Sequence, residues 1–203
     1  MSRDTKQYTV LDAANPRAIA SSVNATPIEV TTAAPHGYAT GDKVSINGHL
    51  VNTNANGSWA VTVTGPTTLE LDGSVGNGIG GATGTIAPKA KYVFAADFRD
   101  CVLALDSDGG GDAAMTVQVV GSIQKTPPDF SRPKSPTNQW DTVQIMDLEG
   151  SVAIDGDVGV VLAATDVNRM YEVNVNGLEW ISVVIPTGTA GEVTVKARLF
   201  NNN

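Results

Sequence analysis

Short runs in which apolar and polar residues alternate recur from Ile28 almost to the C-terminus. In the first run, Ile28 and Val30 point to one side of a strand and the intervening Glu29 to the other, because successive strand side chains face opposite ways. Asn56-Gly57 and similar pairs between the runs are turn signals. No stretch of ten or more residues has the period of an amphipathic helix. We therefore expect an all-β protein.

Length and composition predict how many parts the chain has. With 203 residues it is long enough for two small domains. A hydrophobic content of 41% supplies a core, whereas 5% aromatic residues and 21 glycines favour short strands joined by many turns. A proline and two lysines interrupt the pattern at residues 88–91, which we interpret as a linker. We expect a small β-barrel or meander at residues 22–87 and an antiparallel, jelly-roll-like β-sandwich at residues 92–203.

Each expected domain has its own set of alternating strands. In the first, the apolar positions are Ile28, Val30, Val44, Ile46, Trp59, Val61, Val63, Leu69 and Leu71. A glycine-rich loop at residues 73–84 then leads to a short return strand near Thr85-Ile86. In the second, the apolar positions are Cys101, Leu103, Leu105, Met115, Val117, Val119, Val143, Ile145, Val158, Val160, Leu162, Tyr171, Val173, Val175, Val193, Val195, Ala197 and Leu199. So many short strands in one stretch are typical of a sandwich.

Residues 1–21 show no convincing period and contain Pro16. We interpret them as an N-terminal arm that is ordered only against a partner, because so little apolar surface cannot offset an ordering entropy of about 1–2 kcal/mol per residue. Two alternatives stay open. The segment is either a frayed terminus without a role, or part of the fold as a strand through Tyr8 to Leu11.

Two segments of the second domain predict contacts with other chains. Leu178 to Ile185 is apolar on both faces, which is typical of a central strand or of a strand covered by a neighbouring subunit. On that basis we expect a homo-oligomer, specifically a trimer. Lys125 to Asn138 holds four prolines and little apolar content, which predicts an irregular surface loop that carries contacts.

The charge balance and the N-terminus exclude several partners. A net charge of -8 and a pI near 4.6 argue against nucleic-acid binding, because phosphates are bound by clustered lysines and arginines. The first residues, MSRDTKQYTV, lack the apolar core of a signal peptide, and no run approaches the roughly 18 apolar residues of a membrane span. We expect neither a nucleic-acid nor a membrane partner.

The residue types that carry out catalysis are few. The spacings of serine-hydrolase, phosphate-loop, zinc-protease and CxxC motifs do not occur. His36, between Pro35 and Gly37, is interpreted as a structural turn residue, and His49 as a loop residue at a strand end. Cys101 cannot form an internal disulfide, and its place in an apolar alternation predicts a buried side chain and not a nucleophile. We expect no enzyme activity, no catalytic residue and no cofactor.

One of two acidic loops is a candidate for calcium. Asp106 to Asp112 carries three carboxylates around glycines. Its spacing departs from that of the DxDxDG calcium loop, and no bidentate glutamate follows at the required position. A solvated turn is favoured there. Asp155-Gly156-Asp157 is interpreted as a turn between two strands. No metal site is therefore expected.

The segment from Ser22 to about Ile86 resembles a known β-module. The residues that carry the resemblance are Pro27-Ile28-Glu29-Val30-Thr31-Thr32, Pro35-His36-Gly37, Thr40-Gly41-Asp42-Lys43-Val44, Asn56-Gly57-Ser58-Trp59-Ala60-Val61 and Leu69-Glu70-Leu71-Asp72-Gly73. They are similar to the first catalytic-cysteine half-domain of ubiquitin-activating enzymes, a module that recurs in bacteriophage tail and head proteins. The resemblance implies a structural or interaction module and not ubiquitin chemistry, since the segment has no cysteine. Residues 92–203 resemble, more loosely, the β-sandwich pieces of virion proteins.

Together these features predict a structural protein of a bacteriophage virion, made in the bacterial cytoplasm. We expect a head decoration or cement protein that binds the major capsid protein or other virion proteins. A tail, baseplate or fibre component is the first alternative. A carbohydrate-binding or carbohydrate-cleaving module acting at the host surface is the second, although Trp59, Trp140 and Trp180 are explained as well by core packing as by sugar binding.

Overall fold

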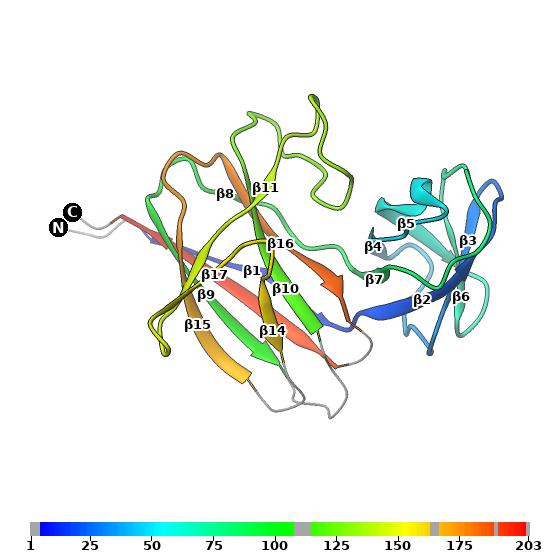
Figure 1. The fold of residues 1–203 in the computed structure, drawn as a ribbon, viewed down its shortest axis with the longest axis horizontal. Coiled ribbons are helices and arrows are strands. Elements are labelled where there is room, and N and C mark those ends of the chain that lie inside the picture. Colours follow the sequence, from blue (N-terminus) through cyan, green and yellow to red (C-terminus); the bar gives the residue numbers. More distant parts are fainter. Residues whose placement is uncertain (1–4, 108–114, 163–166, 189–190, 202–203) are drawn as a thin grey trace.

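A computed structural model describes residues 5–107, 115–162, 167–188 and 191–201, and it divides into a barrel and a sandwich (Figure 1). All strand pairings are antiparallel among these residues. The one helical segment described is a 3-10 turn at Thr53–Ala55. The predicted all-β class, with a barrel followed by antiparallel sheets, is confirmed.

The barrel closes on itself and encloses its own core. Its strands follow the order β2-β3-β6-β5-β4-β7, and their bounds are β2 Arg17–Ser22, β3 Ile28–Thr32, β4 Lys43–Asn47, β5 Gly57–Val63, β6 Thr68–Leu71 and β7 Thr85–Pro88. Most inward positions predicted from the alternation are buried, including Ile28, Val44 and Leu69, whereas the predicted positions Trp59 and Val63 are only partly buried. Closure pairs every strand on both sides and leaves no free edge. The predicted start of the module at residue 22 is five residues too late, because β2 begins at Arg17.

The sandwich packs two sheets face to face. The larger sheet has the order β1-β17-β9-β15-β12-β13, with bounds β1 Thr5–Ala14, β17 Val193–Phe200, β9 Asp100–Ser107, β15 Val167–Asn174, β12 Ile145–Asp147 and β13 Val152–Ile154. The smaller has the order β11-β10-β16-β8, with β14 also pairing β10, and bounds β11 Asp141–Thr142, β10 Met115–Ser122, β16 Trp180–Thr187, β8 Val93–Phe94 and β14 Val160–Leu162.

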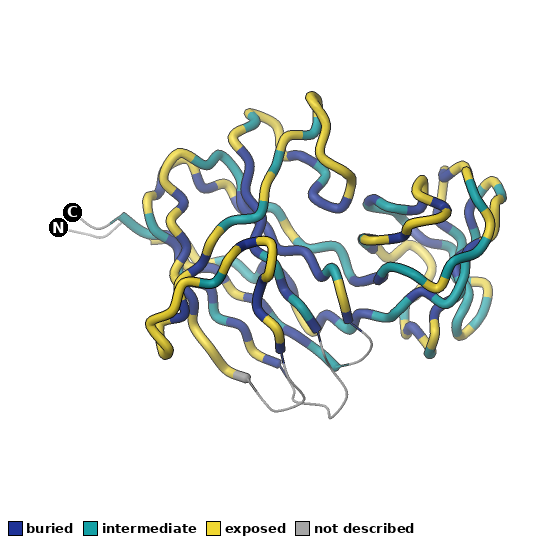
Figure 2. Tube along the Cα trace, in the orientation of Figure 1, coloured by how far each residue is buried: buried dark blue, intermediate teal, exposed yellow. Residues whose placement is uncertain are grey.

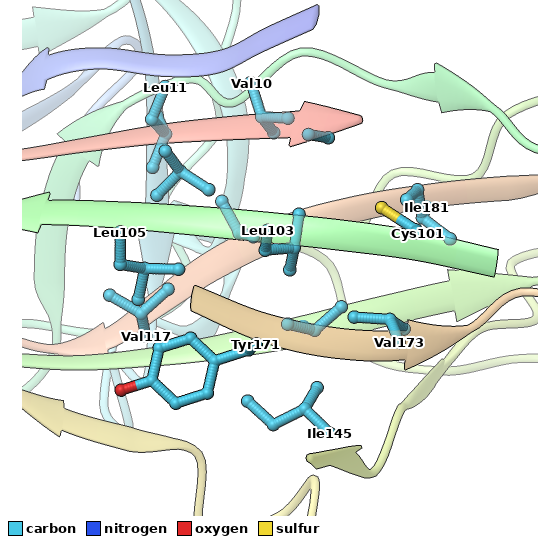
Figure 3. Close-up of a cluster of buried hydrophobic side chains, with 14 of the residues drawn as sticks. Val10, Leu11, Cys101, Leu103, Leu105, Val117, Ile145, Tyr171, Val173 and Ile181 are labelled. Atoms are coloured by element: carbon cyan, nitrogen blue, oxygen red, sulfur yellow. The ribbon is translucent and has the colours of Figure 1, made fainter. Parts of the chain in front are cut away.

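The main core lies between these two sheets. Cys101, Leu103 and Leu105 of β9 face it from the larger sheet, and Val117 and Ile181 face it from the smaller one (Figure 3). Along β9 and β17, buried residues alternate with intermediate or exposed ones, as the colours in Figure 2 show. One predicted core residue is wrong: Val158 is 62% exposed, because it lies in the turn before β14.

The prediction of an N-terminal arm is wrong for the described residues 5–21. Thr5–Ala14 forms β1, which pairs with β17 at the edge of the larger sheet and buries Val10, Leu11 and Ala14 in the main core. The alternation is hard to recognise in the sequence because β1 is irregular. Its register shifts on either side of Leu11, and Ala13 has a positive φ of 44°.

The barrel is an insertion between two strands of the sandwich. The chain builds β1, leaves for the barrel, and returns at Lys91, whose backbone N–H donates to the carbonyl oxygen of Val10 at 2.9 Å. The start and end of the insertion therefore lie side by side, and Figure 1 shows both connections running to the barrel. The predicted boundary at residues 88–91 marks only the second of the two connections.

The segment from Leu178 to Ile185 is a central strand of one chain. It corresponds mainly to β16, which pairs with β10 on one side and β8 on the other. Ile181 faces the main core, whereas Val184 faces a second cluster on the opposite side of the sheet. Both faces are thus covered within one chain, so this strand gives no reason for a trimer, and the oligomeric state stays a prediction.

Candidate interaction surfaces

The two histidines hold loops of the barrel in place. His36 is buried, its Nδ1 accepts from the backbone N–H of Tyr38 at 3.0 Å, and its Nε2 therefore donates to the carbonyl oxygen of Gly65 at 3.1 Å. His49 is also buried, although it was expected in an ordinary loop. Its Nδ1 lies 2.7 Å from the Thr83 carbonyl oxygen and so carries the proton, which leaves Nε2 to accept from the Ser22 hydroxyl at 2.8 Å. His49 thus joins its own loop to the end of β2 and to the loop that carries Thr83, at one end of the barrel.

Cys101 is a buried core residue, as predicted. It has no exposed surface, and burial raises the pKa of its thiol to about 12, although a backbone hydrogen bond from Arg198 acts in the opposite direction. A thiolate nucleophile at neutral pH is incompatible with that pKa. Cys101 belongs to the main core together with Ile181 of the facing sheet (Figure 3).

The acidic loops show no metal centre in the described part of the chain. The predicted Asp106–Asp112 loop lies outside the described residues from position 108 onward. Asp155-Gly156-Asp157 is a turn, as predicted, in which the Asp155 carboxylate accepts from the Asp157 backbone N–H at 2.9 Å. Within the ranges that the structure describes, no group of three His, Cys, Asp or Glu side chains is arranged to hold a metal.

The proline-rich loop from Lys125 to Asn138 is irregular, as predicted, but much of it packs against the same chain. Phe130 is buried over the outer face of the smaller sheet, together with Val120 and Val184. Trp140 lies edge-on to Phe130 with ring centroids 6.0 Å apart. The loop therefore covers a second small core, which explains two of the three tryptophans, since Trp180 belongs to the same cluster.

The same loop connects the sandwich to the barrel. The Ser58 hydroxyl of β5 donates to the Asp129 carboxylate at 3.1 Å, and the Ser131 hydroxyl donates to it at 2.5 Å. Beside this contact, the guanidinium of Arg132 lies 5.3 Å from the ring centroid of Trp59. We call Ser58, Trp59, Asp129, Ser131 and Arg132 the junction. It braces the insertion against the body of the protein.

Asp129 is held in its charged form at the junction. Burial alone would raise the pKa of its carboxyl. Hydrogen bonds from Ser131 and Ser58, together with the positive charge of Lys89, outweigh burial and lower that pKa below the usual 3.8. The carboxylate is therefore ionised throughout the physiological range, and its hydrogen bonds are charge-assisted.

The barrel presents an unusual set of exposed apolar side chains at one end. We call this set the apolar loop end; its members are Val23, Leu50, Val51, Val75 and Ile79, exposed by 45%, 72%, 46%, 57% and 76% respectively. They come from three loops, at residues 23–27, 48–56 and 73–84, that contain no Asp, Glu, Lys or Arg. Clustered exposed aliphatic residues on a globular protein mark an interaction site more often than scattered ones do.

Asparagine side chains join these loops to one another. Asn52 donates to the Val23 carbonyl oxygen at 3.2 Å and accepts from the Asn77 backbone N–H at 3.0 Å. Asn54 donates to the carbonyl oxygen of Val75 at 2.9 Å. Each bond spans more than 20 residues of sequence. The apolar side chains thus stand on a cross-linked support and not on independent loops.

Glycines let the loops approach one another closely. A Cβ at Gly78 would lie 2.6 Å from the Val51 carbonyl oxygen, and one at Gly81 would lie 2.9 Å from a methyl group of Val51. Only glycine fits at such separations. The glycine-rich stretch at residues 73–84 is a loop, as predicted, and it is packed against the loop that carries Leu50 and Val51.

A second exposed surface lies on the outer face of the larger sheet. It is a shallow groove of about 440 Å³ across β1, β17, β9 and β15. Small and apolar side chains, Val102 and Ala104, form its floor, and Lys196 and Arg198 stand beside them. These residues alternate with the predicted inward positions of β9 and β17, but nothing in the sequence indicated that they form one surface.

Comparisons with known proteins give little information on function. No family model matches the chain, and no curated protein matches it. One structural neighbour is the crystal structure of SPBc2 prophage-derived protein YomS, with 11% sequence identity, a TM-score of 0.38, and coverage of 55% of this chain and 79% of that one. That neighbour is a prophage protein, but a likeness this weak carries no functional argument. The resemblance of residues 22–86 to the half-domain of ubiquitin-activating enzymes stays an interpretation of the sequence.

Among the described residues, no helix is both long and apolar enough to cross a bilayer.

Proposed function

We propose that this chain is a non-enzymatic structural component of a bacteriophage virion, a head decoration or cement protein that binds the major capsid protein through the apolar loop end. The observation that carries the proposal is the apolar loop end itself. Its five aliphatic side chains are exposed, yet hydrogen bonds and close glycine contacts hold the loops beneath them. A support of this kind lowers the entropy lost on binding, because the loops are already ordered.

The shape of the molecule favours the same role. The barrel projects from the sandwich as a separate body, held by two adjacent connections and the junction (Figure 1). A body placed in this way reaches a partner without disturbing the main core. The sequence resemblance of residues 22–86 to modules of phage head and tail proteins is the second support.

The size of the surface predicts weak binding by each copy. Burying Leu50 and Ile79 fully contributes about 1.5–3 kcal/mol each. Association costs on the order of 4–15 kcal/mol in lost freedom, so a few such side chains give modest affinity alone. A decoration protein does not need more, since many copies on one particle raise the occupancy through multivalency.

The test is binding to particles that lack this protein. Wild-type protein is expected to co-sediment with them and to appear as ordered density, with its barrel toward the capsid, in a particle reconstruction. The double variant Leu50→Ser, Ile79→Ser is expected to lose at least tenfold in affinity, roughly the effect of 1.4 kcal/mol. Val158→Ser is the matched control, because Val158 is an aliphatic residue of similar exposure in a turn of the sandwich.

Two results would overturn the proposal. One is absence of the protein from purified particles. The other is equal binding by the double variant and the wild type, which would show that the apolar loop end is not the surface that contacts the particle. Density in the tail or baseplate would replace the head assignment with the alternative of a tail component.

A further inference from the structure

The outer face of the larger sheet has a regular arrangement of side chains around β9. Val102 and Ala104 occupy the middle, and in the register of the sheet each is flanked by a residue of β17 and a residue of β15. Val102 lies between Arg198 and Glu172, and Ala104 lies between Lys196 and Met170. Each of these two sets of three side chains, which run across the strands, thus has a basic residue on β17.

The other side of β9 is acidic or apolar. Glu172 is exposed, Met170 is 56% exposed, and Met146 of β12, which pairs with Glu172, is 40% exposed. Arg198 and Glu172 are separated by β9, hence by two strand spacings of about 4.8 Å each. None of the ion pairs found among the described residues includes Lys196, Arg198 or Glu172.

We infer that this face is the contact between two copies of the chain, related by a two-fold axis that runs parallel to β9 over Val102 and Ala104. A half-turn about this axis places β17 of one copy opposite β15 of the other. Each residue keeps its position along the strand direction. Arg198 of each copy then meets Glu172 of the other. Lys196 of each copy lays its aliphatic stem over Met170 of the other. Val102 and Ala104 meet their own counterparts in the middle.

The symmetry makes this contact self-complementary. In a two-fold contact the same patch serves both subunits, so every favourable pair occurs twice. A two-fold axis at right angles to the strands would instead bring the basic residues of β17 against each other. Charge complementarity therefore selects both the partner, a second copy, and the direction of the axis.

Small side chains at the centre permit close approach of the two sheets. Four strands about 4.8 Å apart and about eight residues long cover roughly 19 Å by 26 Å, or about 500 Å² per copy. Two copies would thus bury about 1,000 Å², which is the lower limit for a specific interface. Asp100 and Asp106 lie at the two ends of the outward row of β9, where each meets its own copy. Water strongly screens the repulsion between exposed charges, so these two pairs weaken the contact without cancelling the attraction of the central pairs.

The experiment measures the mass of the purified full-length chain by sedimentation across a range of concentrations. A dimer is expected, with a dissociation constant on the order of micromolar. Arg198→Glu and Glu172→Arg should each weaken it by about tenfold or more, because each change places two pairs of like charges in contact. The double variant Arg198→Glu, Glu172→Arg reverses both charges together and should restore the wild-type affinity.

Matched variants separate this contact from general effects. Lys125→Glu makes the same charge change at an exposed residue far from the face in the fold and should leave the dimer unchanged. Ala104→Arg should abolish the dimer by filling the centre. Thermal unfolding of every variant checks that the sandwich is intact, and rescue by the double variant excludes misfolding as the cause of a lost dimer.

Each contrary result would overturn the inference. A monomer at about 100 µM would exclude a second copy as the occupant at any relevant affinity. A mass of three chains would show the trimer expected from the sequence. A dimer that is indifferent to the single reversals would lie on another face, and a double variant without rescue would contradict the direction of the axis. None of these results bears on particle binding, because the apolar loop end is unchanged in all the variants.

Discussion

The barrel and the sandwich differ in how their strands are drawn from the chain. The barrel is one continuous stretch from Arg17 to Pro88 that closes on itself. The sandwich combines β1, which precedes the barrel, with β8 to β17, which follow it. Its edge strand β1 pairs with β17, so Thr5 faces Phe200 across 195 residues of sequence. The insertion thus leaves the barrel complete and makes the sandwich depend on both halves of the chain.

The barrel has the properties of an independent unit. The barrel has its own core and no free edge, and its start and end lie side by side. We therefore expect the barrel to fold without the sandwich, and the sandwich to keep its fold when the barrel is removed. The sandwich, in contrast, should tolerate loss of the barrel but not loss of β1.

Deleting residues 1–14 should have the largest effect. It removes Val10, Leu11 and Ala14 from the main core, and fully burying the two larger side chains contributes about 1.5–3 kcal/mol each. The backbone pairing with β17 is lost as well. Since a domain is stable by only about 5–15 kcal/mol, the sandwich should unfold or become aggregation-prone while the barrel persists. Circular dichroism and calorimetry of the truncated chain measure this.

The complementary control is the barrel alone, residues 16–90, which should give a cooperative unfolding transition. A truncated chain that melts like the wild type would mean that β1 contributes nothing to the fold. An isolated barrel without a cooperative unfolding transition would contradict the prediction that the insertion folds independently.

A pair of leucine substitutions should separate the two bodies. Leu69 is fully buried in the barrel and Leu103 is buried in the sandwich core. Each change to alanine should cost roughly 2–5 kcal/mol. Leu69→Ala should lower the midpoint of the barrel transition only, and Leu103→Ala that of the sandwich only. Trp59 reports on the barrel by fluorescence when Trp140 and Trp180 are replaced by phenylalanine. If both substitutions shift both transitions equally, the two bodies unfold as one unit.

The sequence was sufficient for the strands whose alternation is regular. In the barrel, the two-residue period at Ile28 and Val30 identified the buried face directly. The period fails at β1, where register shifts surround Leu11, and at Val158, which continues the alternation of β14 into a turn. Pairing over long separations is not encoded in local periodicity, so the link between β1 and β17 was not predictable in this way.

The candidate surfaces were less predictable than the fold. The sequence marked residues 73–84 only as a glycine-rich loop, because hydrogen bonds such as that from Asn54 to Val75 join segments 21 residues apart. The proline-rich loop was located correctly, but its burial of Phe130 depends on the sheet beneath it. The charge arrangement around β9 depends on the order β17-β9-β15, which only the fold provides.

Asp129→Asn should have an intermediate effect, localised to the junction. The change removes a charged acceptor of the Ser58 and Ser131 hydroxyls and should cost about 1–3 kcal/mol at neutral pH. The pKa of Asp129 is lowered in the folded protein, so its stabilising contribution is present above the usual pKa of 3.8 and is lost as the pH falls through the lower folded value. The stability difference between wild type and variant should therefore be constant from pH 7 to about 5 and shrink below 3.8. Asp12→Asn, at an exposed position of β1, is the control. A difference that persists unchanged at low pH would assign the effect to packing and not to charge.

The smallest effect on stability is expected at the apolar loop end. Leu50→Ser and Ile79→Ser replace side chains that are 72% and 76% exposed, so they remove almost no buried surface. Each should change the free energy of unfolding by less than about 0.5 kcal/mol, the range of ordinary surface substitutions. Asn54→Ala beneath them should cost more, about 0.5–1.5 kcal/mol, because it removes the hydrogen bond to Val75. Chemical denaturation of the isolated barrel measures all three. A large decrease in the free energy of unfolding in the serine variants would mean that these aliphatic side chains stabilise the fold. That result would contradict the interpretation of the apolar loop end as a binding surface.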